Sequence, residues 1–352
     1  MRLRNKDIAQ MLGISTTAVS LALNGKPGVS DETRRRVLAI AREDATRAYH
    51  DLGEAEAQGQ TVILSVHKTT GKIIDDKPFF TNLIESVQQE AMREGCLIAL
   101  AHYVPGQDLT AYLSYLRSMK ASGIIVEATE LTYDELSAYK QLDLPMVLVD
   151  GYFDLEDVDA VTLDDTTAVF RAFDYAWSKG HRRIGFIAGD AGIQNFEHHR
   201  DGFAKGMRIH GLESSSCPIV TVGCTVETAY EGMRTFLAEP PQGFSMPTCW
   251  IAQLDYIAIG AMRALREAGY AIPDDVSMIG YDDVALAAMA EPPLTTTRVD
   301  RTDIGLLAMQ ALARRMRRPG APHTVTTVGS KLIERASVRD LNDLSAADMK
   351  RL

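Results

Sequence analysis

The sequence has few cysteines and no apolar run of membrane length. Four cysteines occur, none with CxxC spacing, and each lies in an apolar stretch: Cys96, Cys217, Cys224 and Cys249. We therefore expect buried free thiols in a reducing cytoplasm, not disulfides or a zinc site. No 18 consecutive apolar residues occur, which excludes a membrane-spanning helix. The charged start MRLRNKDIAQ also lacks the apolar core of a secretory signal, so we expect a cytoplasmic protein without membrane contact.

Common catalytic signatures are also missing. The chain contains no Walker A loop, no GxGxxG, no GxSxG and no HExxH, which are the motifs of nucleotide-binding proteins, serine hydrolases and zinc peptidases. We therefore expect no catalytic residue, no metal site and no cofactor. An enzyme on the later α/β part of the chain stays open as an alternative, which a turnover screen with sugar phosphates would test.

Charge is distributed unevenly over the 352 residues. Residues 1–50 contain nine basic and five acidic side chains, a net charge of +4, although the whole chain carries −10. A small basic segment on an acidic body favours a polyanion as partner of that segment alone. A solvated basic surface is the alternative that charge by itself leaves open.

The first 41 residues predict three short helices. Gly13 ends the first helix, Ser15 can cap a second, the GKPG stretch breaks the chain, and Ser30 can cap a third. The apolar positions of the three helices are Ile8, Met11 and Leu12; Ala18, Val19, Ala22 and Leu23; and Val37, Leu38 and Ala41. Two short helices around a tight glycine turn, closed by a third, are typical of a helix-turn-helix.

Residues 4–41 resemble the DNA-binding head of the lac repressor (LacI/GalR) family. The family pattern DVAxxAGVSxxTVSxxLN…VSxxTRxxV is matched by DIAQMLGISTTAVSLALNGKPGVSDETRRRV. The resemblance implies that the second helix enters the major groove, with Thr16 and Thr17 at base-reading positions and Leu21 at a third. The other residues that we expect at the DNA, mostly at phosphates, are Arg4, Lys6, Ser15, Ser20, Asn24, Ser30 and Thr33.

From Thr61 onward, apolar strand-like runs alternate with amphipathic helix-length segments. Examples are TVILSV, CLIALAHY, GIIVEA and PMVLVD, followed by a second series that includes RIGFIAG, PIVTVG, PTCWIAQ and DVSMIGYDD. Continuous apolar strands between helices predict parallel sheets covered on both faces. About ten strands in about 280 residues fit two sheets, with a ligand cleft at the carboxyl ends of the strands.

This body resembles the periplasmic-binding-protein-like core of the same family. The motifs GHRRIGFIAGD, HHRDGF, LDYIAIGAMRALREAGYAIPDDVSMIGYDD and PPLTTTRVD occur in the family's order. The resemblance implies an α/β fold: a three-helix head plus a core of two doubly wound parallel-sheet subdomains. The expected segments are a head and hinge at 1–58, a core at 59–340 and a tail at 341–352. Within the core we expect subdomain 1 at about 61–160 and 297–324, and subdomain 2 at about 161–296 and 325–340.

The resemblance also implies a set of effector-binding residues. Arg200 in HHRDGF matches an arginine that grips hydroxyls or an anionic group, and Asp282 in GYDD matches a carboxylate that accepts paired hydroxyls. Phe79 and Phe80 match positions that supply an aromatic face. The remaining candidates are His67, Lys68 and Asp150, which end strands and would face the same cleft, and Leu254, which stands where the family commonly has a ligand-contacting asparagine.

Between head and body the sequence departs from the family. Relatives carry Tyr-x-Pro-Asn followed by Ala-x-x-Leu, which forms a hinge helix on the operator. Here the segment reads REDATRAYHDLGEAEAQGQT, without Pro-Asn and with Ala55 near the place of the leucine. The hinge therefore lacks the side chain that relatives insert into the minor groove.

Together these features predict a homodimeric, sequence-specific regulator of transcription that acts as a repressor. Its partners would be double-stranded operator DNA and a small carbohydrate-like effector bound between the two core subdomains. A regulator with a vestigial cleft is an alternative, which a thermal-shift screen would separate because a bound ligand stabilises the fold.

Overall fold

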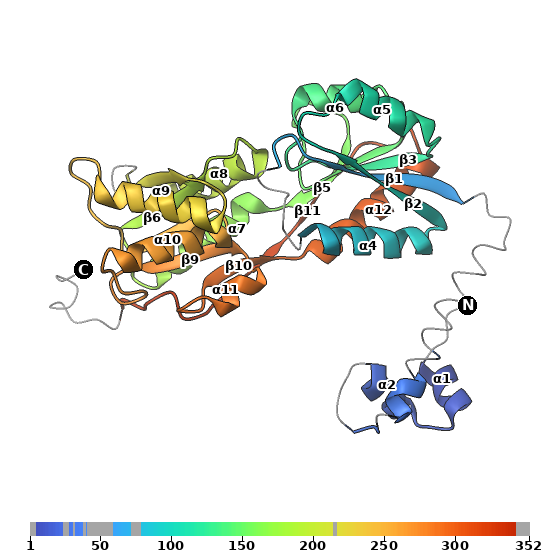
Figure 1. Ribbon diagram of the computed structural model, residues 1–352, viewed down its shortest axis with the longest axis horizontal. Coiled ribbons are helices and arrows are strands. Elements are labelled where there is room, and N and C mark those ends of the chain that lie inside the picture. The colour runs from blue at the N-terminus through green and yellow to red at the C-terminus, as the bar shows by residue number, and fades with distance from the viewer. Residues whose placement is uncertain are drawn as a thin grey trace. The chain divides into compact units, whose positions relative to one another are not determined.

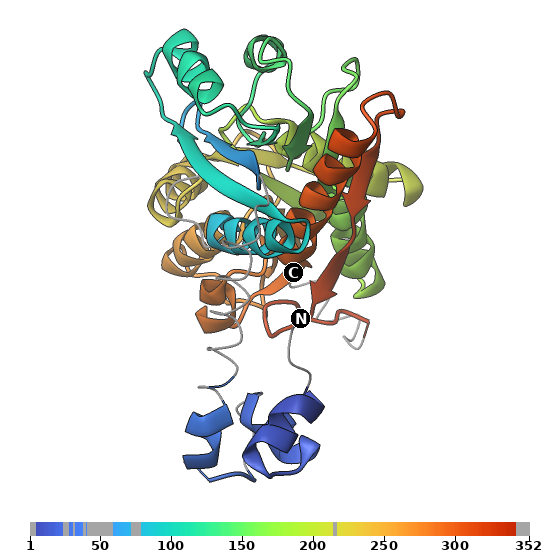
Figure 2. The ribbon, with the colours of Figure 1, turned by 90° about the vertical axis from the view of Figure 1, so that its right-hand side faces the viewer.

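The computed structural model describes residues 5–23, 28–30, 32–37, 40, 59–71, 79–213 and 217–342. Two compact units make up the chain, Met1–Gln60 and Thr61–Leu352. The first is a small helical head, and the second holds two β-sheets with helices on their faces (Figure 1, Figure 2).

The head is built from short helices around a small apolar core. Helix α1 spans Asn5–Leu12, α2 spans Thr16–Leu23, and residues 32–37 are also helical. Gly13, with a φ of +67°, lies in the left-handed region that favours glycine and ends α1 as expected. The buried residues are Ile8, Ala9, Val19, Ala22 and Val37.

Two of the apolar side chains singled out in the head lie on its surface. Met11 is 62% exposed and Leu23 is 37% exposed. A helix of eight residues in so small a head buries only one narrow stripe, which Ile8 with Ala9 and Val19 with Ala22 already fill. The expected positions of Leu38 and Ala41 fall outside the described residues.

The first sheet of the second unit is covered on both faces. Its order is β11-β5-β4-β3-β1-β2, with β1 at Gln60–His67, β2 at Cys96–Tyr103, β3 at Gly123–Glu127, β4 at Met146–Val149, β5 at Asp159–Leu163 and β11 at Val325–Val328. Helices α4 (Phe79–Arg93) and α12 (Arg301–Arg317) lie on one face, and α5 (Leu109–Ser118) and α6 (Tyr133–Lys140) on the other (Figure 1).

Strand β1 shows why its apolar run is continuous. Leu64 belongs to the apolar cluster that includes Leu83 of α4, whereas the neighbouring Ile63 belongs to the cluster of Leu116 in α5. Successive side chains of a strand point to opposite faces, and helices cover both. Each position of the strand is therefore apolar, as in other parallel sheets.

The second sheet repeats this arrangement. Its order is β12-β10-β9-β8-β6-β7, with β6 at Ile184–Gly189, β7 at Ile219–Val222, β8 at Cys249–Ala252, β9 at Ser277–Asp282, β10 at Thr295–Val299 and β12 at Ser330–Ile333. Helices α7 (Asp165–Ser178) and α8 (Gln194–Ile209) pack together, as do α9 (Val226–Ala238) and α10 (Asp255–Glu267), and the short α11 (Ala285–Met289) follows β9. Strands β10 and β12 are antiparallel, whereas β6 to β10 pair in parallel.

The chain passes between the two sheets three times, after β5, after β10 and after β11. These passages fall a few residues later than the expected subdomain limits near 160, 297 and 324. Strand β11 pairs in parallel with β5 from Val325 to Val328, so it stays with the first sheet. Pairing of β5 with β11 continues to Leu163 and Val328, so two of the passages lie at the ends of these strands.

The last described residues close the second half of this unit. Ser337 donates its hydroxyl to the Met278 carbonyl at 2.6 Å and accepts from the Thr295 backbone at 2.8 Å. The Leu341 N–H donates to the Lys179 carbonyl at 2.7 Å. The two Ser337 bonds satisfy backbone groups of β9 and β10, and the Leu341 bond satisfies a carbonyl at the end of α7.

The cysteines are all buried and unpaired, as expected. Burial raises the pKa of the Cys249 thiol, which makes this group inert. Within the described ranges, no helix combines the length and apolar character needed to cross a bilayer, and no group of three His, Cys, Asp or Glu residues could hold a metal ion.

Candidate functional site

The amino end of α2 presents two exposed threonines, Thr16 and Thr17. Ser15 precedes them and accepts the Ala18 N–H on its hydroxyl at 3.1 Å, which caps the helix as expected. A helix N-terminus carries partial positive charge and free N–H groups, so it favours approach to phosphate. Lys6 on α1 is exposed as well.

The other head residues differ in how available they are. Leu21 is half-buried and lies against Gly28, where an added Cβ would stand 3.2 Å from the Leu21 Cδ1. The Ser30 and Thr33 hydroxyls bond each other at 2.8 Å, and Ser20 is half-buried. Arg4 and Asn24 lie outside the described residues. Thr16 and Thr17 are thus the most accessible of the base-reading candidates.

In the larger unit, polar side chains from both halves meet where strands end. Asp150 directly follows β4, Asp282 ends β9, and Arg301 begins α12. The Arg301 Nη2 donates to the Asp282 Oδ1 at 2.5 Å, and only 8% of Asp282 is exposed. Asp150 and Asp282 have φ values of +59° and +112°. Strained backbone of this kind gathers at functional sites.

Helices α7 and α8 and strand β9 bring three more polar groups to the same place. The Asn195 side-chain amide donates to the Asp150 Oδ1 at 3.2 Å and to the Asp165 Oδ2 at 3.3 Å. The Tyr281 hydroxyl donates to the Asp165 Oδ1 at 2.5 Å. One amide therefore links the end of β4 in the first half to the start of α7 in the second.

Carboxyl groups crowd the end of β3. The Thr129 hydroxyl contacts a Glu127 carboxylate oxygen and lies 2.5 Å from the Asp150 Oδ2. Burial and the Asp150 charge raise the pKa of Glu127 well above its usual range. Burial and the Asp165 charge raise the pKa of Asp150 to about 7. Burial and repulsion from like charges both oppose ionisation, so protons are retained here near neutral pH.

On α8 the structure places His199, not Arg200, against these groups. The His199 Nε2 lies 3.4 Å from the Asp165 Oδ1, and its ring centroid lies 4.3 Å from that of Tyr281. Arg200 is half-buried, and within the described residues its guanidinium forms no hydrogen bond or ion pair. Adjacent positions of a helix point about 100° apart, so the neighbouring residue takes the inward place.

His67 does not join this site. It is fully buried, its ring stacks on Tyr103 with centroids 4.4 Å apart, and its Nδ1 bonds the Tyr139 hydroxyl at 3.0 Å. Its Nε2 lies 3.1 Å from Glu135. Burial outweighs that carboxylate and lowers the pKa of His67, so the ring is neutral. The expectation that His67 faces the cleft is not supported, because its strand end turns into the aromatic core.

The remaining candidates are placed as follows. Leu254 is buried in the apolar cluster that includes Trp250 and Ile257. Lys68 is half-buried. Phe79 and Phe80 begin α4, but their side chains lie outside the description. Of the sequence candidates, the structure brings Asp150 and Asp282 into one group of contacts.

That group also contains residues that the sequence analysis missed. We call it the central cluster, and its members are Glu127, Thr129, Asp150, Asp165, Asn195, His199, Tyr281, Asp282 and Arg301. Most of them lie within two residues of a strand's end or a helix's start. Position after a strand was therefore the available signal, but it did not tell which of these polar residues meet.

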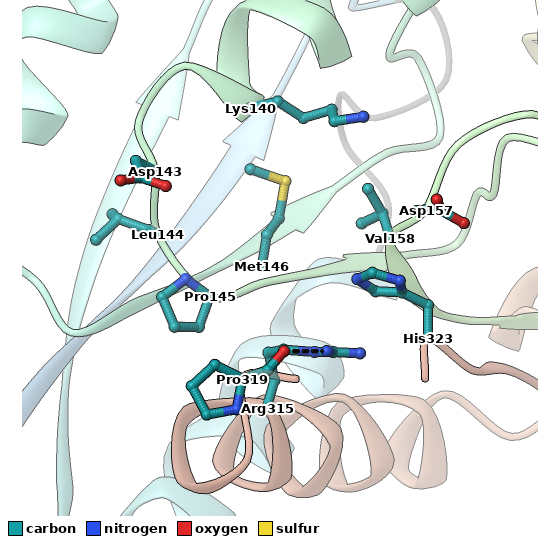
Figure 3. A pocket seen from close by; sticks show the side chains of 10 residues that line it. All are labelled: Lys140, Asp143, Leu144, Pro145, Met146, Asp157, Val158, Arg315, Pro319 and His323. Atoms are coloured by element: carbon teal, nitrogen blue, oxygen red, sulfur yellow. Dashed lines mark hydrogen bonds between the residues drawn. The ribbon is translucent and has the colours of Figure 1, made fainter. Parts of the chain in front are cut away.

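A separate hollow of about 390 Å³ lies at the opposite, amino ends of β4 and β5, beside Lys140, Met146, Arg315 and His323 (Figure 3). Its cationic groups already have partners. Lys140 pairs with Glu156 at 2.5 Å, and Arg315 pairs with Asp159 at 2.7 Å. The central cluster is therefore the better candidate for ligand binding.

Two segments of the chain match known protein families. Residues 6–45 match the family described as bacterial regulatory proteins, lacI family, and residues 173–338 match the periplasmic binding protein-like domain. The chain belongs to the lacI family. Both matches agree with the architecture, a helix-turn-helix head followed by two parallel-sheet halves. The protein is a DNA-binding regulator of transcription.

Full-length members of the lacI family resemble the chain throughout. It is 29% identical over 342 residues to the transcriptional repressor PurR of Histophilus somni (strain 129Pt), which covers 96% of this chain and 99% of that protein. It is also 29% identical over 342 residues to the repressor CytR of Escherichia coli (strain K12), covering 96% of each. These relatives are named repressors, not enzymes.

Solved lacI-family structures share the fold. A complex of the regulator CelR with cellobiose has a TM-score of 0.70 at 23% identity and covers 96% of this chain and 100% of that one. The lac repressor dimer bound to operator and an anti-inducer has a TM-score of 0.69 at 18% identity with the same coverage.

Proposed function

We propose that this regulator is a cytoplasmic repressor that binds a palindromic operator as a homodimer and responds to a small hydroxyl-rich effector at the central cluster. The observation that carries the DNA-binding part is the capped amino end of α2 with Thr16 and Thr17 exposed. Relatives named as repressors along nearly their full length support the sign of regulation.

An exposed apolar edge supports self-association. Strand β2 is an edge strand of its sheet. Its side chains include Leu97, which is 61% exposed, and Leu100, which is 42% exposed. An open strand edge with apolar side chains is normally covered by a partner. A second copy of the chain, as in the lac repressor dimer, fits that need and would place two heads on one operator.

The effector part rests on the chemistry of the central cluster. Buried carboxylates such as Asp282 accept hydrogen bonds from paired hydroxyls, and two related proteins were solved with cellobiose and with ribose bound. Selection of bound duplexes from a random pool, followed by release with candidate sugars, tests both parts. A pool without a symmetric motif would contradict the proposal.

The first prediction concerns operator specificity. Replacing Thr16 or Thr17 by Ala removes a hydroxyl and a methyl from the groove, so the preferred bases at one position of each half-site should change. Each altered base pair is worth about 1–3 kcal/mol. Random-sequence selection on both variants measures the change. The matched control is Lys6→Ala, which should weaken all sites alike and reduce the salt dependence.

The second prediction concerns the operator's shape. Ala55 and the acidic residues Asp51, Glu54 and Glu56 lie outside the described residues, and their sequence provides no apolar wedge and carries charge that phosphates repel. We expect little bending at the centre of the bound site. Circular-permutation gel shifts measure the bend, and an angle typical of wedge-inserting proteins would refute this.

The third prediction concerns Asp282 as an effector anchor. Asp282→Asn keeps an acceptor for Arg301 but loses the charge, so effector affinity should fall roughly tenfold to a hundredfold, the value of a hydrogen bond to a charged group. Calorimetry with the cognate sugar measures it. Asp274→Asn, at an exposed carboxylate, serves as the control, and equal affinity in both variants would remove Asp282 from the site.

A further inference from the structure

The central cluster has more negative than positive groups. Four carboxyl groups, Glu127, Asp150, Asp165 and Asp282, are each at least nine-tenths buried. Within the described residues of the cluster, the single permanent cation is Arg301, and its guanidinium is bonded to Asp282. A buried charge is stable only when it is paired. The cluster therefore holds more acidic groups than cations, and it limits its negative charge by retaining protons, as the raised pKa values of Glu127 and Asp150 indicate.

Two buried polar atoms of the cluster also lack a hydrogen-bond partner among the described residues. Asn195 is 8% exposed, and its amide nitrogen is directed at Asp150 and Asp165, so its Oδ1 is the atom left without a partner. The Glu127 Oε2 has no hydrogen-bond partner either, and Glu127 has no exposed surface. Unpartnered buried polar atoms in a native protein call for an explanation, and a bound donor supplies one.

Asp150 is the group on which these contacts converge. It faces Asp165 at the start of α7, Asp282 at the end of β9, Glu127 through Thr129, and Arg301 at the start of α12. Three of these four neighbours are acids. Arg200, the group that would hold an anion, forms no hydrogen bond or ion pair with the cluster among the described residues.

We propose that the effector is cationic, a sugar-like molecule with a protonated amine that binds between Asp150, Glu127 and the Asn195 carbonyl. An ammonium group has three donors and no acceptor, which matches what the cluster lacks. It would supply positive charge and satisfy acceptors that a hydroxyl group fills less well. The inference rests on the effector site of the proposed function, and it narrows the ligand class to amino sugars and related amines.

The test compares matched ligands on the full-length protein. The pairs are 6-amino-6-deoxyglucose with glucose, glucosamine with glucose and galactosamine with galactose, and glucose 6-phosphate is the anionic comparison. Thermal shift and calorimetry between pH 5.5 and 7 should show at least one amine binding ten times more tightly than its partner. The ratio should increase with pH, because Asp150 loses its proton while an aliphatic amine keeps its own.

Variants separate a ligand contact from a structural role. Asp150→Asn should abolish the rise of the amine-to-hydroxyl ratio with pH, and Glu127→Gln should lower that ratio about tenfold. Asp143→Asn removes the same charge from an exposed position with a φ of +54°, which Asn tolerates, and it should behave as the wild type.

Each result has a definite reading. A panel in which no amine binds better than its partner, or in which the sugar phosphate binds best, overturns the cationic ligand. If neutral sugars bind the protein and cause it to release DNA, the cationic ligand is overturned and the proposed function stays intact. Failure of the proposed function would instead appear in the duplex selection, which uses no ligand.

Discussion

Replacing Arg315 by Met is expected to destabilise the larger unit by about 3–5 kcal/mol, because it leaves a buried carboxylate without its partner. Arg315 is 5% exposed and donates to Asp159 at 2.7 Å, and Asp159 has no exposed surface. The same guanidinium donates to the carbonyls of Pro319, Ala321 and Pro322, which hold the turn between α12 and β11.

Arg317→Met is the matched control for this prediction. Arg317 lies two residues along the same helix and pairs with Glu94, but its side chain is 63% exposed. Exposed ion pairs contribute at most about 1 kcal/mol. Urea unfolding of both variants measures the difference. A loss below about 1 kcal/mol at Arg315 would show that Asp159 is satisfied by other groups.

The pair should also matter in acid. Burial raises the pKa of Asp159, but hydrogen bonds from Arg315 and Thr324 outweigh burial and hold it below its usual range. The folded state then binds the proton less readily than the unfolded state does. The stabilisation by Asp159 is therefore present above the unfolded pKa near 4 and declines as pH falls through the folded value.

Asp150→Asn is expected to stabilise the protein at pH 8 and to leave it unchanged or weaker at pH 5. Burial and the Asp165 charge raise the pKa of Asp150 from 3.8 to about 7, so the folded state binds this proton more tightly than the unfolded state. The stability that the group provides is complete below pH 4 and is lost as pH rises through 7.

The expected size of that effect is several kcal/mol. One pKa unit corresponds to about 1.4 kcal/mol, and the pKa of Asp150 is raised from 3.8 to about 7. Asp255 adds to the same pH dependence in both proteins, because burial and the Asp282 charge raise its pKa to about 8. Urea unfolding of wild type, Asp150→Asn and Asp143→Asn from pH 5 to 8 measures the slope. If the free energy of unfolding changes with pH in the same way in the wild type and in Asp150→Asn, the pKa of Asp150 is not raised by folding.

The sequence predicted the architecture well because local patterns encode it. The helices around Gly13 and Ser15, and apolar runs such as TVILSV, depend on caps and on side-chain alternation, which short stretches contain. The resemblance to the lacI family agreed with both. The expected subdomain limits near 160 and 324 fall a few residues before the ends of β5 and β11, because pairing partners lie far apart in the chain.

The candidate site was predicted less well, for geometric reasons. Asp150 was found because it follows a strand, and Asp282 because it matches a carboxylate in the family's motif. His67 also ends a strand, but it points into the aromatic core. The choice between His199 and Arg200 depends on the rotation of α8 about its axis. The bridge from Asn195 to Asp150 and Asp165 joins three segments, and no local pattern records that meeting.

The closing segment at Ser337–Leu341 affects how the protein is made. Chains are synthesised from the amino end, so the head and the whole first stretch of the core leave the ribosome before Ser337 can bond Met278 and Thr295. The DNA-binding head of a nascent chain can thus be folded while backbone groups of β9 and β10 still lack their bonds to Ser337. A stop codon just before Ser337 would remove these bonds permanently. The truncated chain would keep its DNA-binding head without a complete effector-binding half.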